Sequence, residues 1–525
     1  MKLIGGNYIA GLLSSEGEST FKGINPLDAS ELPTDFYEAT IEEVNKAATK
    51  ANEAFAIYGK KSGKEKAGFL DAIADEILNL GDALIDRCCA ETGLPVGRIT
   101  GERGRTMGQL KLFASVLREG SWVDARIDTA IPDRQPVPKP DIRSMQKPLG
   151  AVGVFGASNF PLAFSVAGGD TASALASGCP VVIKAHPSHP GTCELIAMAI
   201  NAAIKKTDMP VGVFSMVHGK SVEVGMAIVN HSLIKAIGFT GSNKGGKAIF
   251  DAANKRDEPI PVYAEMGSTN PVFILPNALK ERGDEIAEGL TNAVTLGVGQ
   301  FCTNPGIVFL NEGSISSGFQ EKVSNYFEKV EANTMLNEGI KAAFDLGIKN
   351  LANNDKVELL AKGNDNSIGF KGTAHVFETT AKNFLKNNSL EEEIFGPSAI
   401  TITADSKEEL LASAKELKGH LTATLFASES DLEDYKDLIE ILEQKVGRLI
   451  INNFPTGVEV CHSMVHGGPF PATTNSRSTS VGTGAISRFT RPFCYQNFPN
   501  HLLPNELKNE NPLHIFRIVD GEMTK

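Results

Sequence analysis

Short apolar runs rich in β-branched residues alternate with helical segments from residue 150 onward, and this alternation restricts the possible folds more than any other feature. Four such runs are GAVGVFGASNFP, CPVVIKAHP, GVFSMVHG and IKAIGFTGS. Strands that alternate with helices at this spacing predict a parallel β-sheet with helices on both faces. Ligands bind beyond the carboxyl ends of the strands in such sheets, so the turn residues there become candidates for a site.

The rest of the chain divides into helical, α/β and irregular segments. Residues 40–118 predict helices, because Thr40 and Glu43 form a capping-box pattern and apolar residues follow at helical spacing. The expected helices cover about 40–55, 64–89 and 98–117. A second alternation of strands and helices runs from about residue 263 to 453. The proline-rich stretch 130–149 predicts an extended crossing or hairpin, and the tail beyond 482 has weak periodicity.

Composition excludes several classes of function. The 525 residues include 63 acidic and 51 basic ones, a formal net charge of −12, which argues against nucleic acid or an anionic membrane as a partner. The 7 cysteines are an odd number without a repeated spacing, so we expect no disulfide framework and a reducing, cytoplasmic location. We see no signal peptide and no apolar stretch of about 18 residues, and therefore expect no membrane span.

Four loops place a polar or nucleophilic side chain among Gly and Pro: GASNFP at 156–161, FTGSNKGG at 239–246, AEMGSTNP at 264–271 and GQFCTNPG at 299–306. Taken singly, each residue has an ordinary explanation. A lone cysteine such as Cys302 is more often a small buried hydrophobe than a nucleophile. Glu265 at a strand end is usually solvated, Asn159 is usually a turn residue, and Lys184 is usually a surface lysine. To act as a base, Glu265 would need a pKa raised by desolvation.

The combination is more specific than its parts. In chain order come Asn159 in SNFP, Lys184 after a strand, Gly241 and Ser242 in FTGS, Glu265 in EMG, Cys302 in FCTNPG, and the segment EIFGP at 393–397. In order and separation this series resembles the aldehyde dehydrogenase superfamily from about residue 20 to 490. The segment EMGS replaces the common ELGG, and the loop VHGGPFPATTNSRSTSVGT differs from the usual ending.

The resemblance implies a three-part α/β fold. A Rossmann-like NAD(P)-binding domain would comprise residues 1–130 and 150–262, and an α/β catalytic domain residues 263–480. A small β oligomerisation element would comprise 131–149 and 481–525. Members of this superfamily are usually homodimers or homotetramers, and we expect one of these assemblies here.

The resemblance also assigns roles in catalysis. Cys302 would attack the aldehyde carbonyl, giving a thiohemiacetal and, after hydride transfer, a thioester. The Asn159 amide and the backbone N–H of Cys302 would hold the oxyanion. Glu265 would activate the water that hydrolyses the thioester. We expect no metal in this site.

Nine residues are expected to bind the cofactor: Lys184, His186, Ser188, Lys220, Gly241, Ser242, Gly267, Glu393 and Phe395. The segment that follows Lys184, AHPSH at 185–189, contains no carboxylate. A carboxylate there would repel a 2′-phosphate, so we predict a preference for NADP, with NAD as the other candidate. Lys220 is a plausible second phosphate contact.

The substrate prediction rests on a narrower resemblance, carried by ERGRTMGQLKLF, FCTNPG and ISRFTRPF. These segments are similar to bacterial 2,5-dioxovalerate (α-ketoglutarate semialdehyde) dehydrogenases and to an NADP-linked fatty aldehyde dehydrogenase. The first class needs a cation for the distant carboxylate, and we predict Arg105 first and Arg477 second. Phe160 and Phe470 complete the expected substrate residues. The alternatives are a long-chain aldehyde dehydrogenase, a cofactor-independent cysteine hydrolase or thioesterase, and a non-catalytic binding protein on this fold.

Overall fold

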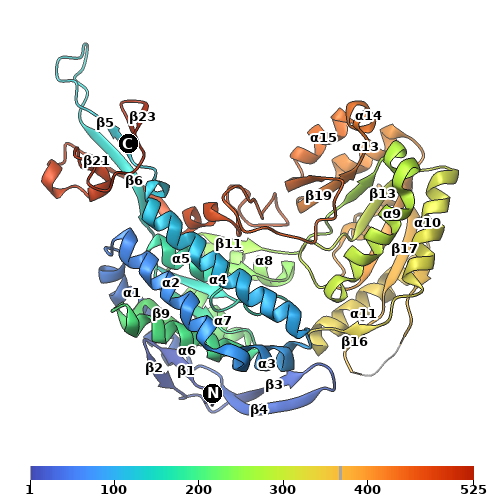
Figure 1. Cartoon of the computed structure of the whole chain (residues 1–525), viewed down its shortest axis with the longest axis horizontal. Helices are drawn as coiled ribbons and strands as arrows, with labels where there is room; N and C mark the ends of the chain where they lie inside the picture. The colour runs from blue at the N-terminus through green and yellow to red at the C-terminus, as the bar shows by residue number, and fades with distance from the viewer. Residues whose placement is uncertain (1, 366–368) are drawn as a thin grey trace.

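The computed structural model describes residues 2–365 and 369–525, and its first large β-sheet has the strand order β11-β10-β7-β8-β9-β1-β2 (Figure 1). Its parallel strands are β7 (Ala151–Phe155), β8 (Val181–Lys184), β9 (Phe214–Val217), β10 (Ile234–Thr240) and β11 (Val262–Glu265). These strands fall on the predicted apolar runs. The predicted α/β fold with a parallel sheet is therefore confirmed.

Helices cover both faces of this sheet because side chains along each strand point alternately to opposite sides. On β8, Val181 and Ile183 join the core that includes α2, α4 and α6, whereas Val182 joins the core that includes α1, α7 and α8. The helices are α1 (Ile41–Tyr58), α2 (Gly63–Asn79), α3 (Gly81–Thr92), α4 (Val96–Glu119), α5 (Gly169–Ser177), α6 (Pro190–Lys206), α7 (Val222–Asn230) and α8 (Asn243–Asn254).

The N-terminal half differs from the prediction in two places. The segment predicted as one helix over 64–89 contains a break, since α2 ends at Asn79 and α3 begins at Gly81 with φ +57°. Four strands before α1 were not predicted, namely β1 (Asn7–Ile9), β2 (Leu12–Ser14), β3 (Thr20–Asn25) and β4 (Ser30–Tyr37). β1 and β2 are too short to show alternation, and β1 is fixed by antiparallel pairing of Tyr8 with Met216 in β9.

A second large sheet has the order β15-β17-β18-β13-β12-β19-β20. Its strands are β12 (Val272–Ile274), β13 (Ile307–Asn311), β15 (Glu358–Lys362), β17 (His375–Thr380), β18 (Ser398–Ala404), β19 (His420–Phe426) and β20 (Val446–Ile451). All pair in parallel except β15, which pairs antiparallel with β17. The covering helices are α9 (Pro276–Thr295), α10 (Ser314–Phe327), α11 (Glu338–Ala352), α12 (Ala381–Phe384), α13 (Lys407–Glu416), α14 (Glu429–Asp434) and α15 (Lys436–Glu443).

A third sheet projects from the body of the molecule, as Figure 1 shows, with the order β21-β6-β5-β22-β23. It contains β5 (Arg126–Asp128), β6 (Ile142–Pro148), β21 (Thr490–Gln496), β22 (Arg517–Val519) and β23 (Glu522–Thr524). The predicted domain boundaries need two corrections, because β5 pairs with β6 and β22 although it precedes residue 130, and because β11 continues past 262 to Glu265.

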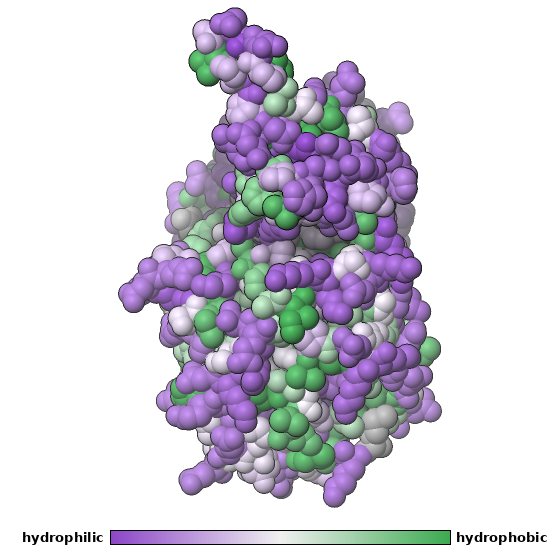
Figure 2. Space-filling model, turned by 90° about the vertical axis from the view of Figure 1, so that its left-hand side faces the viewer, coloured by the Kyte–Doolittle hydropathy of each residue, from purple (hydrophilic) through white to green (hydrophobic). Residues whose placement is uncertain are grey.

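The surface that carries the third sheet is mixed in character. Figure 2 shows apolar residues scattered among polar ones on this face. Among the described residues, no helix has both the length and the hydropathy that a membrane crossing requires.

Candidate active site

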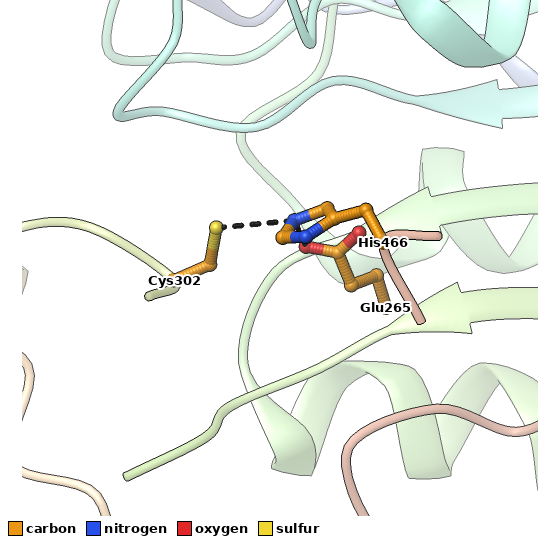
Figure 3. A group of neighbouring side chains, drawn as sticks. All are labelled: Glu265, Cys302 and His466. Atoms are coloured by element: carbon orange, nitrogen blue, oxygen red, sulfur yellow. Dashed lines mark hydrogen bonds and ion pairs between the residues drawn. The ribbon is translucent and has the colours of Figure 1, made fainter. Parts of the chain in front are cut away.

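Three side chains that are far apart in the chain, those of Glu265, Cys302 and His466, meet at one point (Figure 3). Glu265 is the last residue of β11, Cys302 lies in the loop before β13, and His466 lies in the long segment after β20. The Nε2 atom of His466 lies 3.4 Å from Cys302 Sγ and 3.0 Å from Glu265 Oε1. A thiol, an imidazole and a carboxylate at these distances can exchange protons.

The segment that carries His466 is attached directly to the end of β11. Met266 N donates a hydrogen bond of 2.8 Å to Ala472 O, and the Ser480 hydroxyl donates to Glu265 Oε2. Ser480 also donates from Oγ to the carbonyl of His466 at 3.0 Å. These bonds join His466 to Glu265, and His466 is almost fully buried.

Two asparagines hold the loop that contains Cys302. Asn270, in the AEMGSTNP segment, donates from Nδ2 to the carbonyl oxygens of Cys302 and Asn304, each at 2.9 Å. Asn159, in the turn after β7, donates from Nδ2 to Gln300 O at 3.0 Å. A primary amide carries two N–H donors, so Asn159 keeps one that a ligand near Cys302 can use.

The backbone just before Cys302 is not α-helical. α9 ends at Thr295, and Gly297, Val298 and Gly299 then have φ values of +56°, +59° and +64°. A β-branched residue such as Val298 rarely adopts this left-handed conformation. The surrounding contacts, such as Gly299 against the carbonyl of Gly396, hold the turn in place.

Glu265 is ionised more readily than the sequence analysis anticipated. Burial by itself raises its pKa, but the attraction and hydrogen bonding of His466, together with the Ser480 hydroxyl, outweigh burial and place the pKa below its ordinary value. A catalytic base at this position was expected to need a raised pKa, and the pKa of Glu265 is shifted in the opposite direction. The protein supplies polar partners for the carboxylate that no local pattern shows.

Cys302 is held as a thiol in this environment. Burial, followed by the negative charges of Glu265 and Glu393, raises its pKa well above the usual value, and Arg105 opposes the shift. The thiolate is the nucleophilic form, so attack by this sulfur requires that its proton be removed as the new bond forms. His466 Nε2 is placed to receive that proton.

A pocket of about 370 Å³ leads to Cys302 and His466. Its other lining residues come mainly from α4, the turn after β7 and the loop before β13: Gly97, Arg98, Gly101, Glu102, Arg105, Phe160, Phe164, Phe301, Thr303, Thr456 and Val458. Two predicted substrate residues, Arg105 and Phe160, lie in this pocket. The other two, Arg477 and Phe470, are exposed and do not line it. Both residues lie in the segment that Ala472 and Ser480 attach to the end of β11, with their side chains exposed.

The two arginines in the pocket differ in their partners. Arg98, which sequence reasoning missed, lies 3.4 Å from Glu102 and stacks over the rings of Phe160 and Phe301. Arg105 donates to Val458 O at 3.2 Å and stacks over Phe164. Among the described residues, no carboxylate lies within ion-pair distance of Arg105. Its positive charge is therefore available to a ligand.

The first sheet presents the predicted cofactor residues at the carboxyl ends of its strands. Lys184 ends β8 and donates from Nζ to Gly219 O, and burial lowers its pKa to about 8 despite the attraction of Glu38. Ser242 caps the N-terminus of α8, and Gly241 N donates to Glu265 O at 3.1 Å. A helix N-terminus beyond a parallel strand suits a pyrophosphate, so these residues fit a dinucleotide.

Glu393 and Phe395 line a second cleft, of about 210 Å³, whose lining also includes Phe301 and Asn304. Ser268 N donates to Glu393 Oε1 at 3.3 Å, and surrounding protein displaces part of the hydration of this carboxylate and raises its pKa. A Cβ at Gly267 would lie 2.1 Å from Glu393 Oε2, so a larger residue here would displace the carboxylate of Glu393. Glu393 therefore contacts the segment that follows β11 directly, through Ser268.

The remaining predicted cofactor residues lie near Lys184. The His186 ring stacks on that of His189, and Ser188 Oγ accepts a hydrogen bond of 3.0 Å from Asn337 Nδ2. Lys220 has an exposed side chain, and its backbone N–H donates to Glu38. Sequence reasoning missed Glu38, because it precedes Lys184 by more than a hundred residues. This part of the fold therefore contains a carboxylate, although the loop 185–189 does not.

The cysteine, histidine and glutamate do not form a hydrolytic relay. In such a relay the acid holds one ring nitrogen of the histidine while the other meets the nucleophile. Here Glu265 and Cys302 both approach Nε2, and Nδ1 of His466 is buried without a hydrogen-bond partner in the part of the chain that the structure describes. Glu265 lies beside the sulfur, where a carboxylate can act on a group bound to Cys302.

Comparisons with known proteins agree with this geometry. The model of the aldehyde dehydrogenase family matches residues 13–480. The chain is 47% identical over 521 residues to alpha-ketoglutaric semialdehyde dehydrogenase 2 of Azospirillum brasilense, covering 99% of this chain and 98% of that protein. It is 46% identical to alpha-ketoglutaric semialdehyde dehydrogenase of Acinetobacter baylyi, covering 99% of each. The fold matches an aldehyde dehydrogenase from Bacillus cereus with a TM-score of 0.80 at 22% identity, over 94% of this chain and 96% of that one.

Proposed function

The chain belongs to the aldehyde dehydrogenase family, and we propose that it oxidises α-ketoglutaric semialdehyde to 2-oxoglutarate through a covalent adduct on Cys302, with NADP as the preferred oxidant. Members of this family use NAD or NADP. The observation that carries the proposal is the convergence of Cys302, Glu265 and His466 at the end of a pocket that also holds Arg105.

In this proposal each step uses a group already in place. Cys302 Sγ attacks the aldehyde carbon while its thiol proton passes to the pair formed by Glu265 and His466, and the Nε2 atom of His466 lies 3.4 Å from the sulfur. The free N–H of the Asn159 amide and the backbone N–H of Cys302 stabilise the oxyanion of the thiohemiacetal. Bound NADP supplies the acceptor for the hydride. Glu265 then takes a proton from the water that hydrolyses the thioester, and its lowered pKa keeps it ionised for this role.

The substrate assignment is supported by the charge of the pocket. The relatives from Azospirillum brasilense and Acinetobacter baylyi are named for α-ketoglutaric semialdehyde, which carries a carboxylate at the end opposite the aldehyde. Arg105 is the pocket cation without an acidic partner among the described residues. A charged hydrogen bond between the two would orient the aldehyde toward Cys302. A long-chain aldehyde would use Phe160, Phe164 and Phe301 but leave the Arg105 charge unpaired.

The preference for NADP is part of the same proposal. Lys184 would meet the 2′-phosphate, and the loop 185–189 offers no carboxylate to repel it. Glu38 is the residue that could oppose this preference, because it accepts from the backbone N–H groups of Lys220 and Ser221 and interacts with Lys184. A Glu38→Gln variant would strengthen the preference for NADP if its charge reaches the ribose.

For assembly and location we propose what the sequence predicts. We assign cofactor binding to the domain of the first sheet, catalysis to the loop before β13 together with the ends of β7 and β11, and subunit contact to the third sheet. β21 pairs with β6 on one edge only and exposes Phe493, as a strand does when it joins a second subunit. We propose a homodimer or homotetramer, which light scattering would measure. All the cysteines are free thiols, which favours the reducing cytoplasm.

A panel of aldehydes tests the function, assayed by the absorbance of reduced nicotinamide with NAD and with NADP. The expected result is fastest turnover on α-ketoglutaric semialdehyde with NADP, and loss of turnover in Cys302→Ala. Faster turnover on long apolar aldehydes would replace the substrate assignment with the fatty aldehyde alternative. Hydrolysis of thioesters without any nicotinamide reduction over the panel would instead favour the hydrolase class, and no turnover of either kind would favour a binding protein.

A further inference from the structure

The Glu265, Cys302 and His466 cluster has the composition of a site for a soft divalent cation. One ligand atom from each residue lies within 4.8 Å of the others. In a tetrahedral zinc site, Zn–S distances of about 2.3 Å and Zn–N or Zn–O distances of about 2.0 Å place neighbouring ligand atoms roughly 3.3 to 3.6 Å apart. The observed separations of 3.4 Å (Sγ to Nε2) and 3.0 Å (Nε2 to Oε1) differ from these by a few tenths of an ångström.

The hydrogen bonding of the cluster leaves ligand positions free. His466 Nε2 can direct only one lone pair or hydrogen, yet two groups approach it. Glu265 Oε1 is buried, and its polar contact at 3.0 Å is with His466 Nε2, inside the cluster itself. A cation between the three atoms would be bound by the sulfur, the nitrogen and the oxygen at once.

We infer that this cluster binds Zn²⁺, or a divalent ion of similar softness, and that the bound ion reversibly blocks the dehydrogenase. On binding, the S–H bond of Cys302 breaks, its proton passes to solvent, and a Zn–S bond forms without any change of oxidation state. Thiolate and carboxylate balance the charge of the cation, and water takes the fourth position. The sulfur lone pair that would attack the aldehyde carbon is then shared with the metal, so Cys302 cannot act as the nucleophile. Only the inhibitory effect, not the binding itself, rests on the proposed function.

The same geometry indicates a weaker site than a structural zinc centre. The cluster supplies three protein ligands, and Nδ1 of His466 lacks the hydrogen-bond partner that usually orients a metal-bound imidazole. The ion can enter through the 370 Å³ pocket, whose lining includes Cys302 and His466. Arg105 also lines this pocket and repels a cation. We therefore expect a chelator to remove the ion and an aldehyde substrate to compete with it.

Binding can be measured without reference to activity by titrating the full-length protein with Co²⁺, whose tetrahedral thiolate complexes are coloured. We expect a sulfur-to-cobalt absorption that saturates at one ion per chain, disappears when Zn²⁺ is added, and is absent in Cys302→Ser. In His466→Gln the affinity should fall by at least about tenfold, the loss that even a second-shell change typically causes. Circular dichroism and the melting temperature of each variant establish that it is folded.

Matched controls use two other accessible thiols. Cys461→Ser and Cys494→Ser, which alter a half-buried and an exposed cysteine outside the cluster, should bind cobalt as the unaltered protein does. An unchanged affinity in folded His466→Gln, or loss of the absorption in either control variant, would overturn the inference. Inhibition by Zn²⁺ should share the midpoint of binding and be reversed by a chelator without a thiol reductant. A protein that binds cobalt but oxidises no aldehyde would refute the proposed function and leave the metal site standing.

Discussion

Replacement of Arg105 by methionine removes the pocket cation while keeping an unbranched side chain of similar reach. In the structure Arg105 stacks on Phe164 and donates to Val458 O, and a methionine can retain much of the contact with the ring. The carboxylate of a short semialdehyde acid would lose its charged partner, whereas a neutral aldehyde of the same length would not. The comparison of the two substrates therefore separates charge recognition from any general disturbance of the pocket.

The size of the effect follows from the interaction that is lost. A hydrogen bond to a charged group contributes about 1.5–3 kcal/mol, which corresponds to about 10- to 100-fold in kcat/KM. For Arg105 we expect a loss in kcat/KM near the upper end of this range, because Arg105 is shielded from water. The same burial disfavours its charged form and lowers its pKa. Loss of the bond to Val458 O affects both substrates equally and cancels in their ratio.

The assay measures kcat/KM for α-ketoglutaric semialdehyde and for pentanal in Arg105→Met and in the unaltered enzyme. We expect the ratio between the two substrates to fall by the stated factor, with pentanal changed little. Arg477→Met is the matched control, because Arg477 is exposed and absent from the pocket lining, and it should leave the ratio unchanged. A ratio that is unaffected by Arg105→Met, or that falls only in Arg477→Met, would refute the reasoning.

Three further predictions concern the cofactor region and the cysteine loop. Burial lowers the pKa of Lys184 to about 8, so its positive charge is lost as the pH rises through that value. The kcat/KM ratio of NADP to NAD should therefore fall between about pH 7 and about pH 9. A ratio independent of pH would contradict this role. Asn270→Ala removes both hydrogen bonds to the cysteine loop. It should lower kcat by more than about tenfold in steady-state kinetics and destabilise the fold by about 1–3 kcal/mol in urea unfolding. An unchanged kcat would show that other contacts hold the loop. Gly267→Ala places a Cβ against Glu393. It should raise the KM for the cofactor more than the KM for the aldehyde, as measured from the two saturation curves. Equal changes in the two KM values would contradict a role of Glu393 in cofactor binding.

Local patterns were sufficient for the parallel strands from residue 150 onward and for the polar residues at their ends, but not for the four strands before α1. The period-two alternation on β8 and the capping box at Thr40 both depend on residues within a few positions of one another. The same is true of the loops that contain Glu265 and Cys302. By contrast, the left-handed turn at Val298 depends on packing against Met335 and Phe344, which are distant in the sequence.

What the sequence determined by itself was the α/β architecture, the family resemblance and the identity of the polar residues in the turns, because hydrophobic periodicity and turn chemistry act over short distances. Tertiary structure alone decided which of those residues share an environment. It joined His466 to Cys302 from 164 positions away, turned Arg477 to solvent, and set the pKa of Glu265 below its ordinary value. Electrostatic and hydrogen-bond energies depend on separation in space, and that separation exists only once the strands have paired.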